Sequence, residues 1–176
     1  TTVLGTESLL RALTARGVRR LVHISTFSVY DYRALAVGAE LTEASPIEAR
    51  PLDRDDYAQT KLVQERLVRE FASAGNAVTV VRPGAVYGPG NLWNAGLALG
   101  LPGGFGIGYA PRSRLKLTYV ENCAEAIVLA ASRDEAIGAT VNVVDDDLPT
   151  QLEYARAMRR AGFVVPHEIP VPYVVA

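Results

Sequence analysis

Residue types that would place this chain in a specialised class are scarce or missing. Its single cysteine, Cys123, excludes a disulfide within the chain. That count is consistent with a reducing compartment, and we expect the cytoplasm. No apolar run approaches the roughly 20 residues of a membrane span, and no signal peptide opens the sequence. We therefore expect neither a disulfide-rich secreted domain nor a membrane protein.

A surplus of charge of one sign is missing as well. The 18 Lys and Arg residues nearly balance the 19 Asp and Glu residues, so the net charge is −1. Nothing in this balance favours nucleic acid or an anionic membrane as a partner. The 176 residues are 49% hydrophobic and 21% charged, which is typical of a globular domain with a buried core.

Apolar patterns predict an alternation of helices and strands. We predict helices over residues 1–17, 55–73, 121–132 and 150–162, the last opened by a capping box from Thr150 to Glu153. We predict strands over residues 18–26, 77–83, 115–120 and 139–145. Residues 31–54 are predicted to form a loop, and residues 84–115 to form loops with a short helix. This order is typical of an α/β fold with a parallel sheet covered on both faces.

Tyr57 and Lys61 stand four positions apart in the second predicted helix. Side chains at this spacing share a helix face and lie about 5–6 Å apart at Cβ. A free phenol has a pKa near ~10 and is a poor base at neutral pH, but a neighbouring cation favours the phenolate. Such a phenol could exchange a proton with a substrate alcohol or carbonyl. A solvated helix surface shows the same spacing by chance, so the pair alone leaves both interpretations open.

Residues suited to a ligand follow two of the predicted strands. Ser25 and Thr26 stand where the first strand should end, and Gly84 follows the second. Glycine has no Cβ, so the backbone there can approach a ligand closely. Ligands of open parallel sheets bind beyond the carboxyl ends of the strands. These residues therefore predict one shared crevice.

Four motifs make a family resemblance specific, and they occur in the order HISTFSVY, YAQTK, VRPGAVYGPGN and LTYVENCAEAI. This ordered set resembles the extended short-chain dehydrogenase/reductase family, and within it the NAD-dependent epimerase/dehydratase group, which acts largely on nucleotide sugars. The resemblance covers nearly the whole chain. It implies NAD or NADP as the cofactor, a small-molecule substrate and a Rossmann-type doubly wound parallel sheet of which the second half is present.

The same resemblance implies a division of the chain into regions. The NAD(P)-binding Rossmann domain would hold residues 1–90 and 116–147, and part of a small C-terminal substrate-binding region would hold residues 91–115 and 148–176. Relatives pair through two helices that correspond to residues 6–16 and 55–73 here, so a homodimer is expected for the whole protein.

Roles for single residues are also implied by the resemblance. Tyr57 would be the catalytic acid/base, Lys61 would hold the nicotinamide ribose and tune the phenol, and Thr26 would hydrogen-bond the substrate oxygen. The residues expected at the cofactor are Ser25, Tyr57, Lys61, Pro83 and Gly84, although Ser25 also suits a structural role. The residues expected at the substrate are Thr26, Tyr87, Asn91 and Arg112, with turn or surface roles left open for the last three. Arg82 is expected to pair at the strand end.

The implied reaction is hydride exchange at a carbinol or keto carbon, most readily of a nucleotide sugar. Two alternatives stay open: an NAD(P)-dependent ketone reductase or hydroxysteroid-type dehydrogenase, and a non-catalytic dinucleotide-binding scaffold. Scaffold relatives tend to lose the Tyr and Lys pair that this chain keeps, so the scaffold ranks below the enzymes. His23, in a predicted strand, is expected to be a core residue, and His167 has no partner at metal spacing, so no metal site is predicted.

The glycine-rich turn that holds the cofactor's pyrophosphate in relatives is missing. GGFGIG at residues 103–108 has the wrong spacing and lies between loops. Thr2 stands where relatives often carry the asparagine of a proton relay. The sequence also begins without Met and ends on the apolar PVPYVVA. We therefore expect a fragment cut at both ends that binds NAD(P) poorly by itself.

Overall fold

The chain folds into two units in the computed structural model. The first comprises Thr1–Gly84 and Cys123–Val143, and the second comprises Ala85–Asn122 and Val144–Ala176. The structure describes residues 2–36, 38–92, 99–101, 105–109, 113–165 and 167–171.

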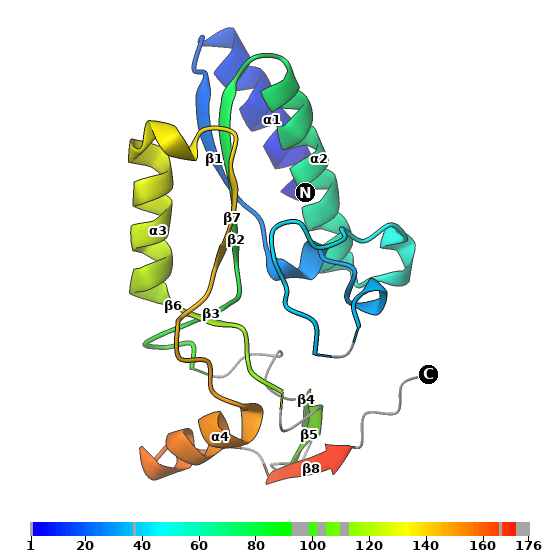
Figure 1. Ribbon diagram of the computed structural model, residues 1–176, viewed down its shortest axis with the longest axis vertical. Coiled ribbons are helices and arrows are strands. Elements are labelled where there is room, and N and C mark those ends of the chain that lie inside the picture. Colours follow the sequence, from blue (N-terminus) through cyan, green and yellow to red (C-terminus); the bar gives the residue numbers. More distant parts are fainter. Residues whose placement is uncertain are drawn as a thin grey trace. The chain divides into compact units, whose positions relative to one another are not determined.

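A three-stranded parallel sheet forms the centre of the first unit (Figure 1). Its order is β1 (Arg20–Ile24), β2 (Ala77–Pro83) and β7 (Thr140–Val143). Arg20 is paired with Ala77 and Val80 with Thr140. β2 has a neighbour on each side and is buried along most of its length, whereas every residue of β1, an edge strand of this sheet, is only partly buried. These parallel pairings confirm the predicted arrangement. The prediction rested on apolar, β-branched runs, which favour strands buried on both faces.

Helices cover both faces of this sheet. α1 (Thr2–Ala15) and α2 (Asp56–Ser73) pack against each other on one face, where the buried core consists of Leu10, Val68, Phe71, Val78 and Val80. α3 (Val120–Ser132) lies on the opposite face (Figure 1). Successive strand residues point to opposite faces, so Val80 contacts the α1 and α2 core while Val81 faces α3. The doubly wound fold predicted from the sequence is confirmed.

Short turns and one long loop connect these elements. Residues 31–54 were predicted as a loop, and the helical turns in their described part are the 3-10 turns η2 (Tyr32–Ala34) and η3 (Pro51–Asp53). Two further 3-10 turns are η1 (Phe27–Val29), directly after β1, and η4 (Asp134–Ala136), before β7. The long loop also reaches the far strand of the sheet, since the Glu43 carboxylate accepts a 2.7 Å hydrogen bond from the backbone N–H of Asn142 in β7.

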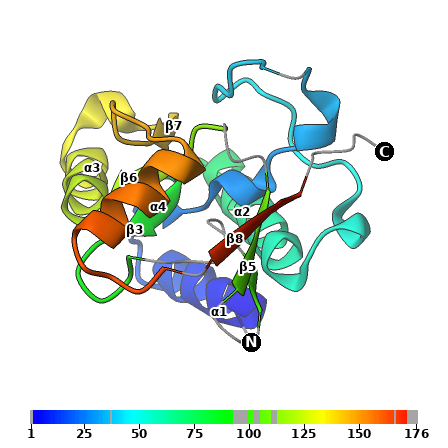
Figure 2. The ribbon, with the colours of Figure 1, turned by 90° about the horizontal axis from the view of Figure 1, so that it is seen from below.

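The second unit is built from short strands and one helix. β3 (Ala85–Tyr87) pairs in parallel with β6 (Leu117–Tyr119). In a separate sheet, β5 (Phe105–Tyr109) pairs with β4 (Leu99–Leu101). The other neighbour of β5 is β8 (His167–Val171), which is seen beside it in Figure 2. α4 (Gln151–Arg160) begins with the predicted capping box, in which Thr150 and Glu153 bond reciprocally. The buried core of the second unit consists of Leu117, Tyr154, Ala155, Met158 and Val165.

The prediction for residues 84–115 was wrong in one respect. The described part of this segment holds β3, β4 and β5, where we predicted loops with a short helix. Runs of three to five residues that are rich in glycine carry too little β propensity to stand out from a loop. β8, near the end of the chain, was also not predicted. No helix in the described ranges has the length and apolar character needed to cross a membrane.

Candidate active site

α2 presents the predicted catalytic pair at its first turns. Asp55 caps the helix, because its carboxylate accepts a 3.0 Å hydrogen bond from the N–H of Ala58. This cap fixes the helix start at Asp56, one residue before Tyr57. The Tyr57 side chain is 55% exposed, and in the described part of the chain its phenol makes no hydrogen bond. The phenol is therefore accessible to a ligand.

Lys61 joins α2 to the end of β1. Its ammonium donates a 3.0 Å hydrogen bond to the carbonyl of Ile24, the last residue of that strand. The side chain is partly buried, and this burial lowers the pKa of Lys61. An ammonium has three N–H donors, so two remain for a ligand. The contact places the cation beside the strand end from which Ser25 and Thr26 follow.

Thr26 is buried and caps the turn η1. Its hydroxyl oxygen accepts a 3.2 Å hydrogen bond from the N–H of Ser28 and lies 3.4 Å from the Ser28 hydroxyl oxygen. α2 packs against η1, so Thr26 lies on a turn that contacts the helix of Tyr57 and Lys61. The structure brings Lys61 to this strand end, but no hydrogen bond joins Tyr57 to Thr26 or to Lys61 among these described residues.

Ser25 and Arg82 meet at a buried carboxylate that sequence analysis missed. The Ser25 hydroxyl donates a 2.7 Å hydrogen bond to Glu65, and the Arg82 guanidinium donates to both oxygens of the same carboxylate. Arg82 is 1% exposed, and its hydrogen bonds to Glu65 confirm that it pairs at the end of β2. Burial would raise the pKa of Glu65, but hydrogen bonds from Arg82, Ser25 and Arg69 outweigh it and lower that pKa to about 2. One signal was available, because Glu65 follows Lys61 by one more helical step of four.

Pro83 and Gly84 continue β2 beyond Arg82. Pro83 is buried and is paired with Val143 of β7, and the N–H of Gly84 donates a 3.0 Å hydrogen bond to the Val143 carbonyl. The backbone of Gly84 is therefore held at the carboxyl end of the sheet. This is the edge at which β1 also ends.

Apart from Thr26, the predicted substrate residues lie in the second unit or outside the described residues. Tyr87 is partly buried against the rings of Tyr119 and Tyr154, at centroid distances of 5.5 and 6.2 Å. Asn91 closes a turn, since its amide donates a 3.2 Å hydrogen bond to the Val86 carbonyl. Arg112 lies outside the described residues. A role of these three in substrate binding stays a prediction.

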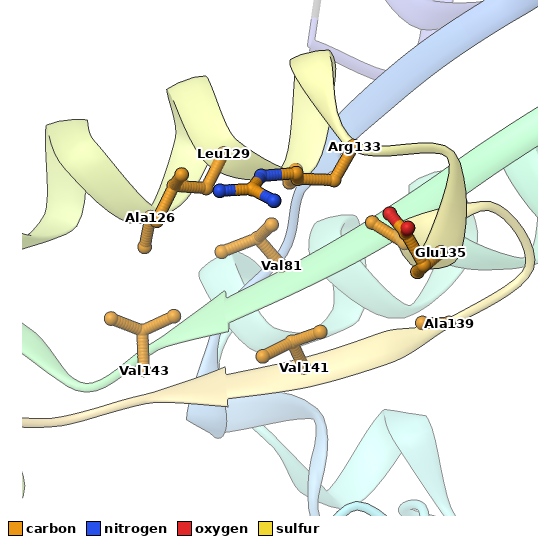
Figure 3. Close-up of a pocket in the computed structure, with 10 residues that line it drawn as sticks. Val81, Ala126, Leu129, Arg133, Glu135, Ala139, Val141 and Val143 are labelled. Carbon is orange, nitrogen blue, oxygen red and sulfur yellow. The ribbon is translucent and has the colours of Figure 1, made fainter.

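Two other features of the first unit do not belong to this group of residues. An apolar pocket of about 560 Å³ lies between α3 and the strands, and Figure 3 shows Val81, Val141 and Val143 beside Ala126 and Leu129. It is on the sheet face opposite to α2. On the α2 side, burial and the charge of Lys61 lower the pKa of His23 to about 4. No cluster of three metal-ligand side chains occurs among the residues that the structure describes.

Taken together, the doubly wound sheet and the Tyr-x-x-x-Lys helix beside its carboxyl end define a short-chain dehydrogenase/reductase. Residues 1–143 match the NAD dependent epimerase/dehydratase family, and the chain belongs to this family. The family assignment and the Rossmann-type fold predicted from the sequence are thereby confirmed. NAD dependence is likewise confirmed at the level of the family.

Curated relatives cover the chain well but are much longer. Short-chain dehydrogenase/reductase family 42E member 1 of Mus musculus is 30% identical over 173 residues, which are 92% of this chain and 42% of the relative. Sterol demethylase protein B of Methylococcus capsulatus is 37% identical over 87 residues, which are 49% of this chain and 25% of the relative. The chain thus spans less than half the length of these relatives.

Solved structures are similar over almost the whole chain. UDP-glucose 4-epimerase of Thermus thermophilus in complex with NAD has a TM-score of 0.71 and 25% identity, covering 97% of this chain and 57% of that one. The terminal R domain of the myxalamid PKS-NRPS pathway has a TM-score of 0.73 and 31% identity, covering 97% of this chain and 43% of that one.

Proposed function

We propose that the whole protein is an NAD(P)-dependent oxidoreductase that exchanges a hydride at a carbinol or keto carbon of a small molecule. The observation that carries this proposal is the contact of Lys61 with the carbonyl of Ile24. This contact holds a cation at the strand end from which Thr26 follows, and the exposed Tyr57 lies one helical turn before that cation. These groups are what proton transfer to or from a substrate oxygen requires.

The residues of this chain divide the work of the reaction. Thr26 holds the substrate oxygen through its hydroxyl, and Tyr57 takes the proton of an alcohol or returns it to a developing alkoxide. Lys61 stabilises the phenolate by its charge and offers its remaining N–H donors to ribose hydroxyls. A bound nicotinamide cofactor supplies the hydride chemistry, so the protein contributes orientation and charge.

The side chains present fit the ribose and nicotinamide end of such a cofactor. Two N–H donors of Lys61 are available, the Tyr57 phenol is accessible, and Gly84 ends β2 at the same edge of the sheet. Pro83 and Gly84 would lie against the nicotinamide. A glycine-rich turn for the pyrophosphate does not occur in this sequence, so that part of the cofactor needs residues beyond this chain.

Two substrate classes are candidates. A nucleotide sugar is supported by the similarity of the chain to UDP-glucose 4-epimerase at 25% identity over 97% of its length. An apolar ketone or hydroxysteroid-type alcohol is supported by two relatives at 37% identity over 87 residues. One is sterol demethylase protein B, and the other is a ketoreductase of a farnesyl-dihydroquinoline oxide from Stigmatella aurantiaca. The relatives of higher identity thus favour the second class over the one first expected from the sequence.

The decisive test of the mechanism is Tyr57→Phe in the whole protein. Loss of the phenol should lower kcat by about 10²–10⁴-fold, the usual contribution of a positioned acid/base, while the affinity for NAD(H) changes little. Tyr32→Phe removes a phenol hydroxyl of the long loop, which donates to the Phe27 carbonyl, and should keep turnover. A Tyr57→Phe protein with the wild-type rate would refute the assignment of the base. A wild-type protein that binds no nicotinamide cofactor would refute the enzyme, and one that binds the cofactor without any turnover would favour the dinucleotide-binding scaffold.

Substrate class is tested by absorbance of the reduced nicotinamide during turnover. An epimerase returns the hydride to the substrate before the substrate dissociates, so no net NADH accumulates with UDP-sugars. A dehydrogenase releases reduced cofactor, and a reductase consumes it with a sterol-like ketone. The homodimer and the cytoplasmic location stay predictions, and size-exclusion chromatography with light scattering of the whole protein tests the first.

A further inference from the structure

Glu65 is a buried acid that the proposed mechanism does not use. It lies on α2 four residues after Lys61 and eight after Tyr57, so the three side chains follow one another along one face of the helix. Glu65 is only 5% exposed. Its carboxylate accepts five hydrogen bonds, from Ser25, Arg69 and Arg82. A buried charge is tolerated when it is paired and hydrogen-bonded in this way.

One set of these bonds joins α2 to the end of β1. Lys61 donates to the carbonyl of Ile24 at 3.0 Å, and Glu65 accepts from the hydroxyl of Ser25 at 2.7 Å. Two consecutive turns of the helix thus hold two consecutive residues of the chain. We call these two bonds, from Lys61 to Ile24 and from Ser25 to Glu65, the clamp. Thr26 is the next residue of the chain, so the clamp sets the distance between the Thr26 hydroxyl and the helix that carries Tyr57.

The other set joins the same carboxylate to the end of β2. Arg82 donates to Glu65 through Nε at 3.2 Å and also through Nη2, and it directly precedes Pro83 and Gly84. The Nη1 group of Arg82 donates to the Tyr30 hydroxyl at 2.9 Å, which in turn donates to Asn142 of β7 at 2.7 Å. Glu65 therefore connects α2 to two strand ends directly and to the third through Arg82 and Tyr30.

We infer that Glu65 is a positioning residue that fixes α2, and with it Tyr57 and Lys61, against the carboxyl ends of β1 and β2. In this role the Ser25 hydroxyl serves Glu65 and not the cofactor. The inference rests on the proposed function, because positioning has meaning only if Tyr57 and Lys61 act in the reaction. A catalytic group displaced by about 1 Å loses on the order of 10²-fold in rate, so loosening the clamp should reduce turnover more than binding.

Ser25→Ala and Glu65→Gln in the whole protein test the inference. We expect both to lower kcat by about 10–100-fold, with the KM for NAD(P) changed by less than about threefold. The pH at which turnover reaches half of its maximum should move up, because a less well placed ammonium favours the phenolate less. Glu65→Leu, which also removes the acceptor oxygens, should lose more than Glu65→Gln. Glu70→Gln, on an exposed position of the same helix, is the matched control and should behave as wild type.

The outcomes separate this inference from the proposed function. Wild-type kcat and pH dependence in Ser25→Ala and Glu65→Gln would overturn the inference if Tyr57→Phe is inactive in the same assay. A rise in the KM for NAD(P) in Ser25→Ala alone would overturn it too, since Ser25 would then bind the cofactor. Turnover by Tyr57→Phe would instead refute the proposed function. If the Glu65 variants do not fold, Ser25→Ala still decides, because it leaves the bonds from Arg69 and Arg82 intact.

Discussion

The ion pair between Arg82 and Glu65 allows the most quantitative prediction. Arg82 is 1% exposed and makes two hydrogen bonds to Glu65, which is 5% exposed. Breaking a buried pair by removing one partner typically costs about 3–5 kcal/mol. In Arg82→Met the carboxylate keeps its bonds from Ser25 and Arg69, so the loss should fall at the lower end. We expect the free energy of unfolding to drop by about 3 kcal/mol, a change of roughly 100-fold in the unfolding equilibrium.

Urea unfolding of the whole protein, followed by circular dichroism, measures this loss. The control is Arg66→Met, because Arg66 pairs with Glu70 at 3.9 Å with both side chains at least 65% exposed; such surface pairs are worth about 0–1 kcal/mol. The double variant Arg82→Met with Glu65→Leu should recover much of the loss, since apolar side chains of similar volume replace buried pairs at little cost. A loss below about 1 kcal/mol in Arg82→Met, or full additivity in the double variant, would refute this reasoning.

Two further predictions concern other parts of the chain. Burial first, and then the charge of Lys61, hold the pKa of His23 near 4 in the folded protein; the folded state therefore binds fewer protons than the unfolded state between about pH 4 and 6.5. The free energy of unfolding should therefore fall as pH drops through this window, and His23→Leu should flatten this dependence. Urea unfolding midpoints at a series of pH values measure it. An equal slope of stability against pH in both proteins would contradict the prediction. In Gly88→Ala the new Cβ would lie 2.6 Å from Cγ1 of Val120, so thermal unfolding should reveal a loss of about 1–3 kcal/mol. Adding Val120→Ala to Gly88→Ala should restore the lost stability, because it removes the contacting methyl groups. A Gly88→Ala protein as stable as wild type would show that the Val120 side chain moves aside at no cost.

Much of the fold could be predicted because local and tertiary preferences agree. The β-branched run that became β2 suits a strand buried on both faces, and Thr150 and Glu153 form a cap whose pattern is visible in sequence. Tyr57 and Lys61 could likewise be paired by helical spacing alone. β4 and β5 are different, because short glycine-rich strands depend on their partners more than on their own residues.

Glu65 shows where prediction of the site stops. In sequence it is one glutamate among the many charged residues of a helix, and such residues are almost always solvated. Only the fold brings Ser25, 40 residues earlier, and Arg82, 17 residues later, onto its carboxylate. Long-range hydrogen bonding of this kind leaves no periodic pattern in the chain. Sequence analysis therefore found the residues that we propose to meet a substrate, but it did not find Glu65, which we infer to hold them in place.

The hydrogen bond from Asn142 to Glu43 makes the two outer strands of the central sheet unequal in their free backbone donors. The backbone N–H of an outer strand is what a further strand would use for pairing, and on β7 that donor is already occupied by a side chain 99 residues distant. Among the strands that the structure describes, β1 at the other border pairs with β2. A strand added beside β7 would therefore have to displace the Glu43 carboxylate from the N–H of Asn142.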